Sequence, residues 1–438
     1  MEAKQVAVLI YNIIILFTLP VTIAFLAVQL LIHKKYREIV LPRLGFLSHV
    51  IKESPGQKPV FWIHAVSVGE VMAVTPLVKR LREEYPKGRL LVSTVTQTGQ
   101  VTARQKLPEA DGVFYFPFDL PWVVQRVIQR IRPTIFVFLE TEIWPNFLFA
   151  LARAGVPAVM VNGRISEKSY RGYRLLGIFF RKVLETVSLF SVQTDLDKER
   201  LIALGVDAHK VVRTGNMKYD QAVGSVSENP KEIRKGLKLP SPCDLIIAGS
   251  THSGEEEMMA SCYRKLSRRY PRVRLLLAPR HLERLEKIEA MLRLQKLKPV
   301  RKTKMESGEF SSITADTVVL LDTLGELQRL YSAADLVFVG GSLVPIGGHN
   351  VLEPAALAKP ILFGPYTQNC REIAQLLLDR GAACQVRNED HLYEQICSLL
   401  DHPEQSAKMG IQAREVVFEQ QGIVEKNLVL LQRILGNR

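Results

Sequence analysis

Short apolar segments alternate with longer helical patterns from about residue 60 onward, and this alternation limits the possible folds more than any other feature of the chain. The segments are continuous runs of β-branched and aromatic residues, which is typical of strands buried on both faces. Such alternation predicts parallel sheets with helices on both faces. The expected strands are Val60–Ala65, Leu90–Thr96, Val113–Phe116, Ile135–Leu139 and Ala158–Val161, followed by Leu245–Ala248, Val273–Ala278, Val318–Leu321, Leu336–Val339 and Pro360–Phe363.

The chain is long enough for more than one domain, because its 438 residues exceed the size at which single hydrophobic cores stop growing. A segment rich in serine, proline and charge, Gly224–Pro242, interrupts the alternation and marks a boundary. We therefore expect two doubly wound units in series, which bind ligands beyond the carboxyl ends of their strands. The expected divisions are an N-terminal anchor over 1–37, Rossmann-like domains over 38–228 and 229–415, and a C-terminal helix over 416–438.

The N-terminal segment Gln5–Ile32 carries no charged side chain and is long enough to cross a bilayer as a helix. Basic residues follow it in the run His33–Arg37, whereas Lys4 is the only basic residue before it. The positive-inside rule then places the C-terminal side of the segment in the cytoplasm. The alternative is a buried core helix. We expect a single transmembrane helix, with the rest of the chain on the cytoplasmic side.

Composition narrows the classes of partner. Lysine and arginine outnumber aspartate and glutamate by 58 to 44, and the net charge of +14 favours nucleic acid, acidic lipid or a phosphorylated substrate. The five cysteines show no CxxC spacing, which argues against a disulfide scaffold or a zinc site. Many of the basic residues lie between Arg264 and Lys304, so this stretch could attract an anionic membrane or form a solvated helix face.

Acidic residues follow two of the expected strands in the first half of the chain. Glu70 closes the run His64–Glu70 and would lie in the first turn of a helix, with Ser67 as the N-cap. A carboxylate there could accept a proton from an attacking hydroxyl, or it could only complement the helix dipole, which is the commoner role. The run Glu140–Asn146 contains two carboxylates, Glu140 and Glu142, and either could fix a substrate hydroxyl, support a base or cap the next helix.

The remaining candidates are basic, amide-bearing or glycine-rich. Lys218, in the run Gly215–Asp220, could neutralise a phosphate or carboxylate, or it could lie in a solvated loop. Arg280 could bind a phosphate or carboxylate in a fork, and Glu353, which follows Asn350, could bridge ribose hydroxyls. Glycine-rich turns near these residues could cradle a phosphate with their backbone N–H groups. Those turns are Gly249–His252, Gly340–Ser342 and Gly347–Asn350. Together these features predict a nucleotide site at one edge of the second sheet.

Two common sequence motifs do not indicate the function of this chain. No expected strand is followed by GxGxxG with an acidic residue about 20 positions further on, so a nicotinamide-dependent oxidoreductase is not supported. The run Asp195–Asp197 matches the DxD pattern of metal-dependent glycosyltransferases. We interpret it instead as the charged first turn of a helix, with Thr194 or Asp195 as the N-cap.

Taken together, these segments resemble the 3-deoxy-D-manno-octulosonic acid (Kdo) transferases of Gram-negative lipopolysaccharide synthesis. The resemblance runs from the hydrophobic N-terminal segment to about residue 420. It implies a metal-independent glycosyltransferase of the GT-B fold, in which two Rossmann-like domains face a cleft and an N-terminal transmembrane helix precedes them. The segments that carry it are His64–Glu70, Glu140–Asn146, Gly215–Asp220, Pro279–His281 and Gly347–Ala355, in this order.

The resemblance also implies a reaction and its residues. CMP-Kdo would be the donor, and the acceptor would be a lipid A precursor (lipid IVA) at the cytoplasmic face of the inner membrane. The anomeric carbon would be inverted, and inner-membrane lipids but no nucleic acid would be partners. Glu70 would be the general base, and Glu140 and Lys218 would support the transition state. The implied CMP contacts are Pro279, Arg280, Leu324, Gly325, Glu326, Asn350, Val351, Leu352 and Glu353.

Two other functions remain open on the sequence alone. Another membrane-associated GT-B transferase could use a UDP-sugar, and competition between CMP and UDP for binding would distinguish it. A non-catalytic, membrane-tethered anion binder would show no turnover and a strong salt dependence. That second alternative leaves the acidic residues at the strand ends unexplained.

Overall fold

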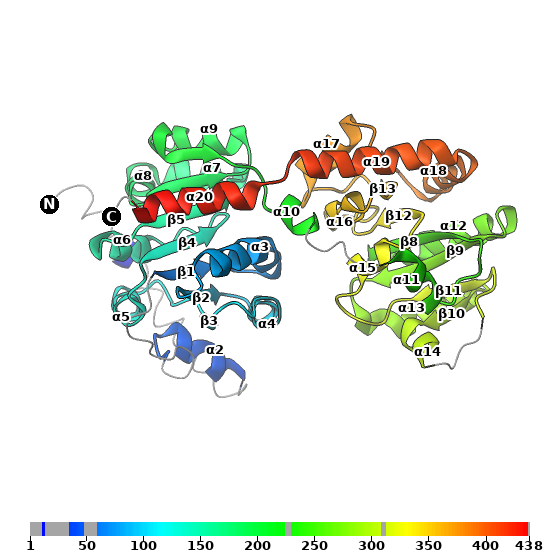
Figure 1. The fold of residues 1–438 in the computed structure, drawn as a ribbon, viewed down its shortest axis with the longest axis horizontal. Helices are drawn as coiled ribbons and strands as arrows, with labels where there is room; N and C mark the ends of the chain where they lie inside the picture. Colours follow the sequence, from blue (N-terminus) through cyan, green and yellow to red (C-terminus); the bar gives the residue numbers. More distant parts are fainter. Residues whose placement is uncertain (1–10, 14–34, 48–58, 224–228, 308–311, 437–438) are drawn as a thin grey trace. The chain divides into compact units, whose positions relative to one another are not determined.

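The computed structural model describes residues 11–13, 35–47, 59–223, 229–307 and 312–436. The chain divides into two compact units, residues 1–221 together with 422–438, and residues 222–421 (Figure 1). Each unit contains one seven-stranded sheet in which all neighbouring strands run parallel. This confirms the two parallel α/β units that the alternation of strand and helix patterns predicts.

The first sheet has the strand order β3-β2-β1-β4-β5-β6-β7. All five expected strands are present, and Ile135–Leu139 has the expected ends. The sequence pattern missed two strands, because β6 contains a buried serine and β7 is only three residues long at the sheet edge. The strands are β1 (Val60–His64), β2 (Arg89–Thr94), β3 (Gly112–Tyr115), β4 (Ile135–Leu139), β5 (Ala158–Gly163), β6 (Leu189–Val192) and β7 (Val211–Arg213).

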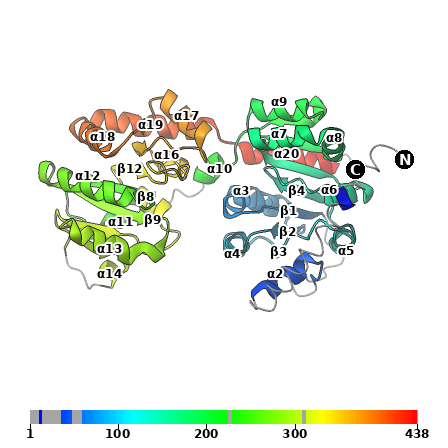
Figure 2. The same ribbon diagram turned by 180° about the vertical axis from the view of Figure 1, so that it is seen from behind.

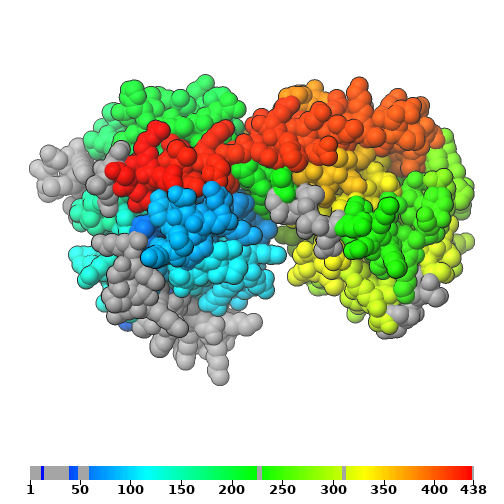
Figure 3. All heavy atoms as spheres, in the orientation of Figure 1, coloured from blue at the N-terminus to red at the C-terminus, as the bar shows by residue number. Residues whose placement is uncertain are grey.

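Helices cover both faces of this sheet (Figures 1 and 2). The last helix, α20, returns to the first unit and packs against α3, as the red and blue atoms in Figure 3 show. Asp220 secures its start by accepting the backbone N–H groups of Gly422 at 2.9 Å and Val424 at 2.6 Å. The helices are α2 (Lys35–Arg43), α3 (Val68–Glu84), α4 (Gln97–Lys106), α5 (Pro121–Ile131), α6 (Pro145–Arg153), α7 (Glu167–Leu175), α8 (Gly177–Glu185), α9 (Asp195–Ala203), α10 (Lys218–Val223) and α20 (Ile423–Gly436), with a 3₁₀ turn η1 (Ala208–Lys210).

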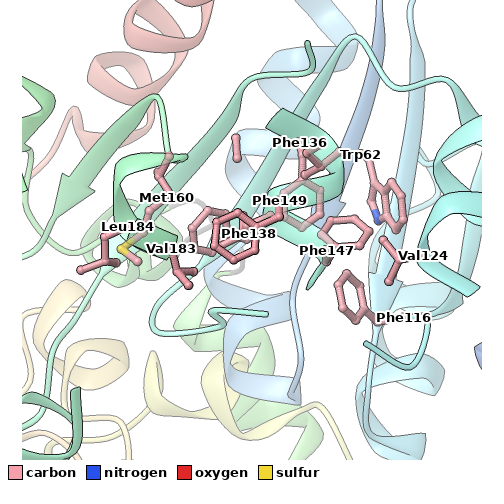
Figure 4. Close-up of a cluster of buried hydrophobic side chains, with 14 of the residues drawn as sticks. Trp62, Phe116, Val124, Phe136, Phe138, Phe147, Phe149, Met160, Val183 and Leu184 are labelled. Carbon is pink, nitrogen blue, oxygen red and sulfur yellow. The ribbon is translucent and has the colours of Figure 1, made fainter. Parts of the chain in front are cut away.

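Aromatic side chains from β1, β4 and α6 form the centre of the first core (Figure 4). The centroid of the Trp62 ring lies 4.9 Å from that of the Phe147 ring and 5.4 Å from that of the Phe136 ring, and both rings meet Trp62 nearly edge-on. The indole N–H of Trp62 donates to the Ser93 hydroxyl at 2.7 Å, so this buried polar group has a partner. Close packing of large rings holds β1 and β4 against each other. The two segments that follow these strands therefore start from fixed positions.

The second sheet has the order β10-β11-β9-β8-β12-β13-β14. Again all five expected strands are present, and the pattern missed β10 and the two-residue β14 at the two sheet edges. The strands are β8 (Asp244–Thr251), β9 (Val273–Pro279), β10 (Lys298–Arg301), β11 (Thr317–Leu320), β12 (Leu336–Val339), β13 (Ile361–Phe363) and β14 (Cys384–Gln385). The helices are α11 (Pro230–Gly236), α12 (Glu255–Arg269), α13 (Leu285–Leu294), α14 (Lys302–Glu306), α15 (Leu327–Tyr331), α16 (Leu352–Ala356), α17 (Arg371–Asp379), α18 (Glu389–Asp401) and α19 (Pro403–Glu419), with a 3₁₀ turn η2 (Leu282–Arg284).

The expected membrane segment Gln5–Ile32 lies outside the described residues, apart from 11–13. Of these three, Tyr11 donates its hydroxyl to Asp119 at 2.9 Å, and the Asn12 side chain accepts the amide of Asn146 at 2.8 Å. None of the helices in the described part of the chain is long and apolar enough to cross a bilayer. The transmembrane helix therefore stays a prediction from the sequence.

Candidate active site

Glu70 lies at the carboxyl edge of the first sheet, buried in the first turn of α3. Its Oε2 accepts the backbone N–H of Val66 at 2.9 Å, and its Oε1 accepts the Ser67 hydroxyl at 3.0 Å. Ser67 is the N-cap residue, as predicted, but its hydroxyl donates to Glu70 instead of accepting a backbone N–H of the helix. Both hydrogen bonds fix the Glu70 carboxylate beside the end of β1.

Burial controls the proton affinity of Glu70. Its pKa is raised to about 7, mainly because burial disfavours the charged form, and the negative charges of Glu140 and Glu142 add to this effect. The hydrogen bonds from Val66 and Ser67 act in the opposite direction. A carboxyl group that titrates near neutral pH can accept a proton from a hydroxyl group and release it again. The surroundings of Glu70 therefore suit a general base better than a residue that only complements the helix dipole.

Glu140 follows β4, which is the neighbour of β1 in the sheet, so the segments after these two strands lie side by side. Glu140 has a φ of +52°, a left-handed conformation that is uncommon for a residue other than glycine and is often found at functional sites. The pKa of Glu142 is raised by burial and by the charge of Glu140, with Trp144 opposing the shift. The structure thus brings Glu70 together with Glu140 and Glu142, the two carboxylates that the sequence places after this strand.

The segment Gly215–Asp220 is anchored to the ends of two strands of the first sheet, β5 and β6. The Asn162 side chain at the end of β5 accepts the backbone N–H of Met217 at 2.9 Å. The Asn216 amide donates to Gln193, which follows β6, at 3.0 Å. The sequence pattern did not single out Asn162 and Gln193, although each is a polar residue at the end of an apolar strand. They hold the turn from which Lys218 begins α10.

The Lys218 side chain forms no hydrogen bond or ion pair with any residue that the structure describes, although its backbone N–H donates to Asn216 at 3.1 Å. In particular, no described contact joins it to Glu70 or Glu140. It lies after the edge strand β7, three strands from β4. The three predicted catalytic residues therefore share the carboxyl edge of one sheet, but only the two glutamates are close neighbours.

The predicted nucleotide residues lie at the carboxyl edge of the second sheet. Arg280 follows β9, and its exposed side chain has no hydrogen-bond or ion-pair partner among the described residues. The Asn350 amide donates to Glu353 at 3.0 Å. Burial raises the pKa of Glu353, and the hydrogen bond from Asn350 and the positive charge of Arg280 oppose this shift. The structure therefore brings Arg280, Asn350 and Glu353 together. Pro279 is buried at the end of β9, while Val351 and Leu352 are buried at the start of α16.

The segment Leu324–Glu326 follows β11, the neighbour of β9, and so lies at the same sheet edge. Leu324 is 79% exposed, and Gly325 has a φ of +84° that favours glycine. Glu326 accepts the Thr323 hydroxyl and pairs with Lys302 at 3.0 Å. These contacts lower the pKa of Glu326 although burial opposes the shift. Glu326 is therefore an ionised side chain with a fixed position.

The expected phosphate cradle at Gly340–Ser342 is wrong, because a side chain of the protein already occupies it. The fully buried carboxylate of Glu255 accepts the N–H groups of Gly341 at 2.7 Å and Ser342 at 2.9 Å. The N–H groups of Gly347 and Gly348 donate to the Gly341 carbonyl at 3.1 and 2.7 Å. These backbone groups are therefore engaged within the protein and are not free to bind a ligand.

The DxD run and the basic stretch have structural roles. Thr194, one of the two predicted residues, is the N-cap of α9, and the structure adds a capping box between Thr194 and Asp197. Asp195 pairs with Arg213 at 3.1 Å. Within the ranges that the structure describes, no three His, Cys, Asp or Glu side chains come together as metal ligands would. Several basic residues of the stretch 264–304 are paired with acidic side chains outside it. These pairs include Lys265–Glu389, Arg269–Asp401, Arg284–Glu256, Lys298–Asp316 and Lys302–Glu326.

Comparison with known proteins gives a consistent result. The family model described as 3-deoxy-D-manno-octulosonic-acid transferase (kdotransferase) matches residues 40–221. The chain is 34% identical over 432 residues to the 3-deoxy-D-manno-octulosonic acid transferase of Haemophilus influenzae, and the match covers 97% of this chain and 98% of that relative. It is also 34% identical over 403 residues to the transferase of the same name from Chlamydophila psittaci, which covers 91% of this chain and 90% of the relative.

A solved glycosyltransferase from Rickettsia africae has a similar fold, with a TM-score of 0.58 at 15% identity, covering 87% of this chain and 100% of that one. At this identity the similarity concerns the fold alone, and it supports the prediction of two parallel α/β domains that resemble those of GT-B glycosyltransferases. The relatives from Haemophilus and Chlamydophila match nearly the whole chain and carry the family assignment. The chain therefore belongs to the 3-deoxy-D-manno-octulosonic acid (Kdo) transferase family and is a glycosyltransferase.

Proposed function

We propose that this glycosyltransferase moves Kdo from CMP-Kdo to a hydroxyl group of a lipid A precursor, with inversion at the anomeric carbon and without a metal ion. The observation that carries the proposal is Glu70, a carboxyl group with a pKa of about 7 at a fixed place on the carboxyl edge of the first sheet. A single displacement needs one base to take the proton of the attacking hydroxyl, and a base that titrates near the operating pH is the most effective.

In this mechanism the acceptor oxygen attacks the anomeric carbon of Kdo while its proton passes to the Glu70 carboxylate. The bond between the anomeric carbon and the phosphate oxygen breaks, and CMP leaves with the bonding electron pair. Two further residues stabilise the charge that develops in the transition state of the transfer. They are Glu140, which lies beside Glu70, and Lys218, which lies in the anchored turn after β7. The negative charge of Glu140 also keeps the pKa of Glu70 high.

The second unit would bind and stabilise the leaving nucleotide. The Arg280 guanidinium, which has no ion-pair partner in the described part of the chain, is suited to a phosphate oxygen. Asn350 and Glu353, joined by a 3.0 Å hydrogen bond, offer polar atoms to the ribose hydroxyls. The buried backbone of Pro279 and of Val351–Leu352 and the turn Leu324–Glu326 complete the proposed CMP site.

We place the reaction at the cytoplasmic face of the inner membrane. The support is the uncharged segment Gln5–Ile32 with basic residues on its C-terminal side, which matches the positive-inside rule. An anchor of this kind would keep the enzyme at the surface where a lipid acceptor resides. Inner-membrane lipids are thus proposed partners, together with CMP-Kdo and the lipid A precursor.

The variant Glu70→Gln tests the base directly, and Glu84→Gln is its matched control because Glu84 is an exposed carboxylate on the same helix. We expect Glu70→Gln to reduce Kdo transfer by about 10²- to 10⁴-fold, the usual contribution of a general base, with an unchanged Kd for CMP. The control should transfer at the wild-type rate. Near wild-type turnover by Glu70→Gln would contradict the base assignment, and displacement of CMP by equimolar UDP would contradict the choice of donor nucleotide.

A further inference from the structure

Three histidines gather beside Arg280 at the carboxyl edge of the second sheet. The Nε2 atoms of His252, after β8, and of His349, after β12, lie 2.8 Å apart, and the two ring planes are inclined by only 4°. His281 meets the His252 ring nearly edge-on, with ring centroids 5.4 Å apart. A hydrogen bond between two Nε2 atoms requires that one imidazole carries the hydrogen and the other accepts it. His252 and His349 therefore form a directly coupled pair.

The buried carboxylate of Glu255 holds this pair from within the domain. It is fully buried and accepts four backbone N–H groups, two on each oxygen. The donors are His252 at 2.9 Å, Gly341 at 2.7 Å, Ser342 at 2.9 Å and Leu343 at 2.9 Å. The Gly341 carbonyl in turn accepts the N–H groups of Gly347 and Gly348, just before His349. One side chain thus fixes His252 and the loop that carries His349 relative to each other.

The pair lies in positive surroundings. The pKa of His349 is lowered to about 4 by burial, and then by the proximity of His252, Arg280 and His281. Burial also lowers the pKa of His252, although the charge of Glu255 opposes this shift. The charged or titratable groups that face the pair are Glu255 on α12, Arg280 and His281 after β9, and Arg284 on η2. Arg284 pairs with Glu256 at 2.9 Å, and the Glu255 oxygens face backbone N–H groups. Arg280 forms no ion pair with any described residue, although its charge also acts on the nearby Glu353 carboxyl group, whose pKa it lowers against the effect of burial.

We infer that His252 and His349 form, together with Arg280, a phosphate subsite of the nucleotide donor, and that the pair takes up one proton from solvent when the phosphate binds. The inference rests on the proposed function, which places the CMP phosphate beside Arg280. A bound phosphate supplies the negative charge that the cluster lacks, so the imidazolium form becomes favourable. The imidazole that donates its Nε2–H still has a free Nδ1 lone pair, and a proton bound there leaves the hydrogen bond between the two Nε2 atoms intact.

Calorimetric titration of the full-length protein with CMP tests this inference. Titration in two buffers of different ionisation enthalpy measures the protons taken up on binding, and cytidine, which lacks the phosphate, is the ligand control. The variants are His349→Gln and His252→Asn, and His391→Gln on α18 is the matched control in the same domain. The phosphate of CMP itself titrates near pH 6, so proton uptake is compared between proteins at the same pH.

We expect wild-type protein and the His391→Gln control to take up protons with CMP but not with cytidine between pH 6 and 7.5. Each pair variant should lose this uptake and bind CMP about 10-fold more weakly or worse, while retaining its melting temperature within a few degrees. Two variants are used because the loss of one ring could disturb the loop. Equal proton uptake and equal CMP affinity in wild type and both variants would overturn the inference but leave the proposed donor intact. Failure of the wild type to bind CMP at all would overturn the proposed donor.

Discussion

Glu255→Gln is the substitution whose effect follows most directly from the structure. The carboxylate is fully buried, and each oxygen accepts two backbone N–H groups at 2.7 to 2.9 Å. Glutamine has nearly the same shape but only one acceptor oxygen. Whichever way the amide is oriented, its NH₂ group must face two backbone N–H donors, which become unsatisfied in a buried place.

The expected cost follows from these two lost contacts. A hydrogen bond to a charged group contributes about 1.5–3 kcal/mol, so two of them amount to about 3–6 kcal/mol. Small shifts of the loop after β12 would recover part of this, and we expect a loss of about 3–5 kcal/mol in the free energy of unfolding of the second unit. For a unit of this size, that corresponds to a fall of about 10 °C in its melting temperature.

Differential scanning calorimetry of the full-length protein measures this change. Glu257→Gln is the matched control, because Glu257 lies in the same turn of α12 but is exposed and accepts a single N–H, from Gly254 at 2.8 Å. Glutamine can still accept that one bond, so the control should lose less than about 1 kcal/mol. If both variants melt within about 2 °C of wild type, the buried carboxylate does not hold the loop as we argue.

Three further results are expected. The rate of Kdo transfer should fall as the pH decreases through about 7, because only ionised Glu70 can accept a proton; an acidic limb near pH 4.5 in the pH–rate profile would be inconsistent with this. Gly341→Ala should weaken CMP binding in calorimetry by about 10-fold or more, because Gly341 has a φ of +68° and an added Cβ would lie 2.8 Å from the His349 ring. An unchanged Kd for CMP would show that the position of His349 does not affect CMP binding. Asp220→Ala removes the acceptor of two N–H groups at the start of α20 and should cost about 1–2 kcal/mol in urea unfolding, whereas an unchanged midpoint would refute that capping role.

The sequence was most informative where one physical signal dominates. Buried parallel strands such as Ile135–Leu139 and Leu336–Val339 are continuous apolar runs, and their ends are correctly predicted. The short edge strands β7 and β14 have only three and two residues, so they leave no recognisable run. The pairing of α20 with the first unit depends on contacts far apart in the sequence, which local patterns do not contain.

The candidate site also combines features that the local sequence predicts with features that depend on tertiary contacts. The position of Glu70 after a strand and at a helix start is readable from the sequence, but its pKa depends on burial and on Glu140 and Glu142, which come from another strand. The glycine turn at Gly340–Ser342 has the composition of a phosphate cradle. Its N–H groups are nevertheless bound by Glu255, a residue about 85 positions away whose role only the tertiary structure reveals.

The most direct test of the proposed reaction is the mass of its product. Detergent-solubilised protein is incubated with CMP-Kdo and a tetra-acylated lipid A precursor, and the lipid is then analysed by mass spectrometry. We predict that the lipid gains the mass of one or more Kdo residues and that Glu70→Gln, tested in parallel, leaves it unchanged. An unmodified lipid in the presence of intact donor and folded wild-type protein would contradict the proposed donor and acceptor.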